Sequence, residues 1–207
     1  MVENVDLKEI EKKAWRATYQ DGLWDIYMGL LIAGFALIFY LNFLGLEEPL
    51  IIFFLCCWNT VPILILSFGK KFITPKRIGS VKFGRKRKKT KQKLTYFLTA
   101  NVFILLIFLI LTQLGLFELI PLEGLMFPLI LGLLISIPLS IVAYFLDFNR
   151  LYVYSIFFGL GYFLSELFYP LVGAPLDSFL SFGVPGIVIT LIGIYFFISF
   201  IKKYPKE

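Results

Sequence analysis

The stretch KKFITPKRIGSVKFGRKRKKTKQK, from Lys70 to Lys93, contains twelve Lys or Arg residues and no Asp or Glu. An apolar run precedes it and another follows it, and 59% of the 207 residues are hydrophobic while only 16% are charged. The mean hydropathy of the chain is +0.85. A soluble domain of this size cannot bury so much apolar surface in its own interior. The sequence therefore predicts a protein that lies partly in lipid and carries one strongly basic segment.

Six apolar runs are each long enough to cross a bilayer, which requires about 20 residues of helix. They cover 26–44, 49–68, 95–117, 125–146, 151–169 and 183–201. Only the fifth run contains a charged residue, Glu166. The six runs predict an all-α integral membrane protein with six transmembrane helices, in a domain that extends over 23–201.

The basic residues predict the orientation of these helices, because Lys and Arg are retained on the cytoplasmic side of a membrane. With six spans, the N-terminus, the 70–93 segment, the 147–150 turn and the C-terminus lie on one side and contain all twenty Lys and Arg residues. The connections on the other side carry only acidic charges, at Glu47, Glu48, Glu118, Glu123 and Asp177. One of them, 170–182, either follows the outer surface or re-enters the membrane. We expect a cell-membrane protein with both termini cytoplasmic, a cytoplasmic loop over 70–93 and a tail over 202–207.

The first 22 residues resemble an amphipathic helix. Leu7, Ile10, Ala14 and Thr18 fall on one stripe with Trp15 beside it, and charged residues fill the remaining positions. Such a pattern is typical of a helix that lies in the membrane interface. The alternative is a peripheral cytosolic helix.

Small residues at helical spacing predict which faces of the spans are buried, because small side chains let helix backbones approach closely in lipid. These stripes are Gly29, Ala33, Ala36 and Tyr40; Gly132, Ser136, Leu139 and Ala143; Ser155, Gly159, Tyr162 and Glu166; and Gly186, Thr190, Gly193 and Phe197. We expect the fifth and sixth spans to pack against each other through their two stripes.

Glu166 is a candidate intramembrane site, since a carboxylate within a span costs roughly 2.5–3.5 kcal/mol on insertion scales. Its stripe places it toward the bundle interior beside Tyr162, and Asn59 and Asn101 are the other polar side chains that could line a path. The alternative role is structural: a hydrogen bond or contact with surface water for Glu166, and cross-helix hydrogen bonds for the amides.

Asp21 and Asp25 form a candidate cytoplasmic acidic cluster at the start of the first span. Asp21 is suited to cap the helix, and both carboxylates lie at the positive end of the helix dipole. Alternatively the cluster faces the basic segment or Arg16. The turn between the fourth and fifth spans contains Asp147 and Arg150, which we expect to cap or pair locally.

The basic segment has more charges than orientation requires. Clusters of four to eight Lys or Arg beside a membrane attract anionic headgroups at about 1 kcal/mol each. The residues that we expect to bind lipid or an acidic partner are Lys76, Arg77, Lys82, Arg85, Lys86, Arg87, Lys88 and Lys89. Nucleic acid is disfavoured as a partner, because Phe72 and Phe83 are too few aromatic residues for a base-stacking surface.

The sequence contains no recognisable catalytic constellation. It has no His, and its two cysteines, Cys56 and Cys57, are adjacent within an apolar run, so neither a metal site nor a cofactor is expected. We therefore expect a non-enzymatic membrane protein whose basic loop binds anionic lipid headgroups or an acidic partner. The alternative is a small-solute or ion transporter that uses Glu166.

Overall fold

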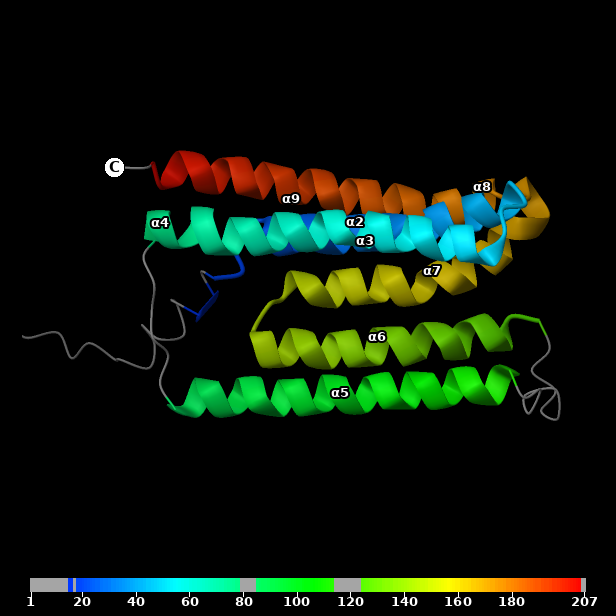
Figure 1. The fold of residues 1–207 in the computed structure, drawn as a ribbon, viewed down its shortest axis with the longest axis horizontal. Coiled ribbons are helices and arrows are strands. Elements are labelled where there is room, and N and C mark those ends of the chain that lie inside the picture. Colours follow the sequence, from blue (N-terminus) through cyan, green and yellow to red (C-terminus); the bar gives the residue numbers. More distant parts are fainter. Residues whose placement is uncertain (1–14, 17, 79–84, 114–123, 206–207) are drawn as a thin grey trace, which may run out of the picture.

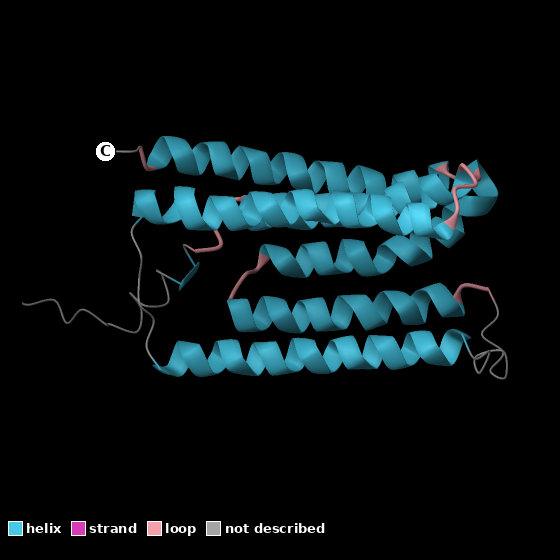
Figure 2. Ribbon diagram, viewed as in Figure 1, coloured by secondary structure: helices cyan, strands magenta, loops and turns pink. Residues whose placement is uncertain are grey.

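The computed structural model describes residues 15, 16, 18–78, 85–113 and 124–205. Within these ranges the regular structure is helical and no strand is present (Figure 2). The described helices, four of them short and two of those four with π-helical geometry (η), are α2 Leu23–Phe43, α3 Glu48–Phe68, η1 Gly69–Ile73, α4 Thr74–Ile78, α5 Arg85–Gln113, α6 Met126–Leu146, α7 Arg150–Val172, α8 Leu176–Ser178, η3 Phe179–Gly183 and α9 Val184–Lys203.

Five helical segments are long and apolar enough to cross a membrane. They are Leu23–Phe43, Glu48–Arg77, Met126–Leu146, Arg150–Val172 and Leu176–Lys203. This finding confirms an all-α fold of membrane type. The predicted third span, 95–117, coincides with α5 as far as Gln113 and then extends beyond the described residues. That this segment crosses the membrane, which would bring the number of spans to six, stays a prediction. Most of the predicted N-terminal helix over 1–22 also lies outside the described residues.

The long helices run side by side, with α5 next to α6, α6 next to α7, and α2 packed against both α3 and α9 (Figure 1). Aromatic side chains join α2 to α7 and to η3: the centroid of the Phe35 ring lies 4.7 Å from that of Phe158 in α7 and 5.6 Å from that of Phe182 in η3. At one end of the bundle lie α4, the start of α5, the α6–α7 turn and the last turn of α9. We call this end the basic end, because every Lys and Arg of the described residues lies there; the other is the opposite end.

Small residues form the closest helix contacts, as their spacing predicts, but the predicted pairing is wrong. A Cβ added to Gly186 of α9 would lie 2.5 Å from the backbone nitrogen of Ala33 in α2, and one added to Gly132 of α6 would overlap the carbonyl of Gly159 in α7. The first span therefore packs against the sixth, and the fourth against the fifth. A stripe of small residues shows which face can approach another helix, but all such stripes are chemically alike and do not select a partner.

The basic segment is helical in its described parts rather than a loop over 70–93. Helix α3 continues through η1 and α4 to Ile78, and α5 begins at Arg85. Lys and Arg are good helix formers, so the charge run extends the helices beyond the apolar spans. The connection between them falls in 79–84, outside the described residues.

The connection 170–182 contains the last residues of α7, a short turn, and then α8 and η3. Helix η3 continues directly into α9. The segment Leu176–Lys203 is therefore one continuous run of helical residues, and its first part, α8 and η3, contacts α7.

Candidate functional site

Asp21 is fully buried at the basic end and is bound by two side chains of the α3 extension. Lys70 Nζ lies 2.6 Å from Asp21 Oδ2, and the Thr74 hydroxyl donates to the same oxygen at 2.7 Å. Lys70 also donates to the backbone carbonyl of Thr18. Gly22, with a φ of 78°, is the N-cap of α2 rather than Asp21, but Asp21 Oδ1 still accepts from the backbone N–H of Leu23, the first residue of α2, at 3.3 Å. Its other oxygen binds Lys70, so the carboxylate also serves as the counter-ion of that lysine.

Asp25 is also fully buried, one turn further along α2, and has the same kind of partners. The Tyr154 hydroxyl donates to Asp25 Oδ1 at 2.6 Å, and Arg150 Nη1 lies 3.1 Å from Oδ2. Arg150 donates to the carbonyl of Tyr19 as well, and its guanidinium lies 4.2 Å from the centroid of the Phe196 ring. The predicted local pairing of Arg150 within its turn is therefore wrong.

Both aspartates are thus neutralised by a cation and a hydroxyl that lie four residues apart on one helix. Asp21 is bound by Lys70 and Thr74, and Asp25 is bound by Arg150 and Tyr154. Residues four apart lie on the same face of a helix. Sequence analysis missed Thr74 and Tyr154, although this repeated spacing of a cation and a hydroxyl was a signal that could have found them.

The segment before α2 is attached to the α6–α7 turn. The indole of Trp15 donates to the carbonyl of Leu146 at 2.8 Å. Arg16 donates to both carboxylate oxygens of Asp147, at 2.8 and 2.9 Å, and this ion pair raises the pKa of Arg16. Burial raises the pKa of the nearby Tyr19 to about 12. Asp147 is the C-cap of α6, as predicted, and its side chain is paired across 131 positions of sequence with Arg16.

Some of the basic residues contact the bundle, and several of them, including Lys91, are exposed. Arg77 donates to the carbonyls of Ile201 and Tyr204 at the end of α9, and Arg87 and Lys91 lie 5.0 and 5.3 Å from the Trp15 ring. The exposed lysines at this end include Lys71, Lys76, Lys89, Lys93, Lys202 and Lys203. The side chains of Lys82, Arg85, Lys86 and Lys88 lie outside the described part of the chain.

A polar hollow of about 460 Å³ opens beside the Arg16–Asp147 pair. Gln20, Asn149 and Arg150 also line it, and Phe196 forms part of its wall. Both of its guanidinium groups are already bound to carboxylates. The hollow therefore adds polar surface to the basic end without presenting an unpaired charge of its own.

Glu166 does not face the bundle interior. Its side chain is exposed, while its neighbour Ser165 is buried. The prediction failed because α7 changes partner along its length: Gly159 faces α6, but Gly161 and Ser165 face η3 and α8. The buried face of α7 therefore changes position around the helix between residues 159 and 165. Residue 166 lies outside this face, although it belongs to the same stripe as Gly159.

The other polar residues predicted to accompany Glu166 are not brought together with it. Tyr162 is half-buried among the rings of Phe35, Phe39 and Phe182. Asn59 donates to Leu55 O within its own helix at 2.9 Å rather than across helices. Asn101 is half-buried on α5, at the other side of the bundle from α3 (Figure 1). These four residues do not form one site.

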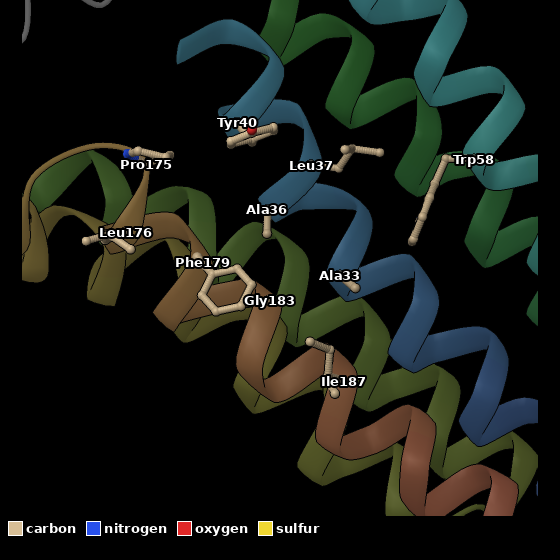
Figure 3. A pocket seen from close by; sticks show the side chains of 10 residues that line it. All are labelled: Ala33, Ala36, Leu37, Tyr40, Trp58, Pro175, Leu176, Phe179, Gly183 and Ile187. Carbon is tan, nitrogen blue, oxygen red and sulfur yellow. The ribbon is translucent and has the colours of Figure 1, made fainter. Parts of the chain in front are cut away.

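An apolar groove of about 530 Å³ lies between α2, α3 and the segment from α8 to α9 (Figure 3). Among the side chains that line it are Ala33, Ala36, Tyr40, Trp58, Phe179 and Ile187. The indole nitrogen of Trp58 donates to the carbonyl of Leu30, so its ring forms one wall of the groove. In a bilayer such a groove is open to lipid tails, and its lining specifies no polar ligand.

No family model matches this chain, and it matches no curated protein and no solved structure.

Proposed function

We propose that the protein is a non-enzymatic membrane protein whose basic end binds anionic lipid headgroups at the cytoplasmic membrane surface. The observation that carries this proposal is the set of exposed lysines at one end of a membrane-type bundle. In this proposal α5 also crosses the membrane, as the third of six spans. Both termini then lie in the cytoplasm, since the positive charges stay on that side.

The exposed lysines are additional to the cations that neutralise buried carboxylates. Lys70 and Arg150 are bound to Asp21 and Asp25, so they contribute little net charge to the surface. Lys76, Lys89 and Lys93 are exposed on the helices that leave the bundle at this end. Each such charge near an anionic membrane surface contributes about 1 kcal/mol. In this proposal the basic end lies at the membrane surface, where lipid headgroups are the anions that the membrane supplies.

Lipid binding by the purified full-length protein tests the proposal. Native mass spectrometry in detergent would compare an anionic with a zwitterionic phospholipid. The triple variant Lys76→Gln, Lys89→Gln, Lys93→Gln loses about 3 kcal/mol of attraction, or about 100-fold in affinity for the anionic lipid. The matched control changes the same three lysines to Arg, which keeps the charge and the affinity.

Equal affinity for both lipids, or an unchanged affinity in the Gln variant, would reject headgroup binding and favour an acidic protein partner for this surface. Raising the salt concentration should weaken lipid binding if the exposed lysines cause it, because exposed charges are screened within about 8 Å at physiological ionic strength. Transport of a small solute or ion through Glu166 stays an alternative prediction, tested by uptake into proteoliposomes with Glu166→Gln.

A further inference from the structure

Asp177 is a buried carboxylate at the opposite end of the bundle, in α8. The hydroxyls of Ser165 and Ser178 both donate to its Oδ2, at 2.7 and 3.0 Å, and lie 3.2 Å from each other. The exposed fractions are 6% for Asp177, 7% for Ser165, 2% for Ser178 and 1% for Ser181. The cluster joins α7 to the segment that leads into α9.

Two oxygens in this cluster have no hydrogen-bond partner among the described residues. They are Asp177 Oδ1 and Ser181 Oγ, and both are buried. Residues 177 and 181 are four apart, so their side chains lie on the same side of the helical segment. Buried polar atoms without a partner cost about 1–3 kcal/mol each and are uncommon in native proteins. These two oxygens therefore indicate a further group that binds between them.

Among the described residues, Asp177 also has no counter-charge of the kind that neutralises Asp21 and Asp25. The sequence contains no Lys or Arg between residues 151 and 201, and every Lys and Arg of the described residues lies at the basic end. A buried charge is normally paired with an opposite charge or bound to a metal ion. A cation from solution or a proton would supply the positive charge that the described residues do not.

We propose that Asp177, Ser165, Ser178 and Ser181 form a binding site for an alkali-metal cation. Carboxylate and hydroxyl oxygens are ligands for hard cations rather than for transition metals. One carboxylate balances one positive charge, whereas a divalent ion would leave an uncompensated charge in a buried site. The site lies beside the π-helical turn η3, a geometry that frequently occurs at functional positions. This inference is independent of lipid binding at the basic end.

The thermal stability of the full-length protein in detergent, measured in NaCl, KCl and choline chloride at constant ionic strength, tests the site. The melting temperature rises with Na⁺ or K⁺ but not with choline, a cation too large for a cluster of serines. The rise disappears in Asp177→Asn and persists in Glu166→Gln, which alters an exposed carboxylate beside Ser165. Binding of radioactive ²²Na⁺ to the purified protein is likewise lost in Asp177→Asn and kept in Glu166→Gln.

Ser181→Ala provides a second variant that does not depend on the folding of Asp177→Asn. Ser181 Oγ has no hydrogen-bond partner among the described residues, so the change removes none of the bonds around Asp177. The cation concentration for half of the stabilisation rises about tenfold, as expected for one lost bond to a charged group.

Three results would overturn the site. One is the same melting curve in all three salts. Another is a cation response in Ser181→Ala or Asp177→Asn equal to that of the wild type. The third is stabilisation by acidic pH alone, whatever the cation, which would show that Asp177 is neutralised by a proton.

Discussion

The two ends of the bundle both bury carboxylates but differ in how they neutralise them. At the basic end, Asp21 and Asp25 each bind a cation and a hydroxyl from a neighbouring helix. At the opposite end, Asp177 receives only serine hydroxyls among the described residues. The bias of Lys and Arg toward one side of the membrane leaves the other side without internal counter-ions. A protein with this distribution of charge has to neutralise buried acidic groups at the end without Lys or Arg by other means.

The largest effect is expected for Arg150→Met. The change leaves Asp25 buried with only the hydroxyl of Tyr154, and removing one partner of a buried ion pair costs about 3–5 kcal/mol. Thermal and denaturant unfolding in detergent measure the loss. A loss below about 1 kcal/mol would mean that Asp25 is already uncharged, and the contrast between the two ends would disappear.

Lys70→Met is expected to cost about 3 kcal/mol, slightly less than Arg150→Met because Thr74 and the backbone of Leu23 still bind Asp21. Lys76→Met is the matched control, since Lys76 is exposed on the same helical extension. It should change the unfolding free energy by less than about 0.5 kcal/mol. Equal losses for both lysines would show that net charge, rather than the buried pair, stabilises this end.

Gly132→Ala tests the middle of the bundle, which contains no ion pair among the described residues. The added methyl overlaps the carbonyl of Gly159 and forces α6 and α7 apart, at a cost of about 1–3 kcal/mol. The loss should be the same at low and high salt, unlike that of an exposed ion pair. A salt-dependent loss would connect this helix contact to the charges at the basic end.

Asp177→Asn is expected to change stability by no more than about 1 kcal/mol in choline chloride, because it removes a charge that has no counter-ion among the described residues and keeps an oxygen that accepts from Ser165. Asp25→Asn, the same change at the basic end, should cost clearly more because it leaves Arg150 unpaired. Parallel unfolding curves measure the difference. Equal losses of stability in the two Asn variants would mean that Arg150 does not neutralise Asp25 as an internal counter-ion.

Arg16→Gln should have the smallest effect. The pair with Asp147 is exposed to solvent, and exposed ion pairs contribute little to stability. We expect no resolvable change in melting temperature. A large decrease would mean that the segment from Trp15 to Asp21 depends on this pair to stay attached to the α6–α7 turn.

The helices themselves could be predicted from the sequence because an apolar run ends where polar residues begin. The predicted fourth span, 125–146, differs by one residue from α6, Met126–Leu146. The separation of basic from acidic charges also follows from the sequence, and it defines the two ends of the bundle. These features are local, so composition along the chain determines them.

The partners could not be predicted, because they depend on how the helices pack. Lys70 lies 49 positions from Asp21 and Tyr154 lies 129 positions from Asp25. Glu166 was placed on the wrong face because α7 packs against two different neighbours. The cluster around Asp177 was missed because serines carry no charge and only packing against α7 shows that they converge.

A double-mutant cycle on Asp25 and Arg150 tests most directly whether the charges of the basic end serve as internal counter-ions. It compares the unfolding free energies of Asp25→Asn, Arg150→Met and the double variant with that of the wild type. The buried pair predicts a coupling energy of about 2 kcal/mol or more, with the double variant more stable than Arg150→Met alone. Losses that add to within about 0.5 kcal/mol would contradict it and show that the two residues stabilise the protein independently.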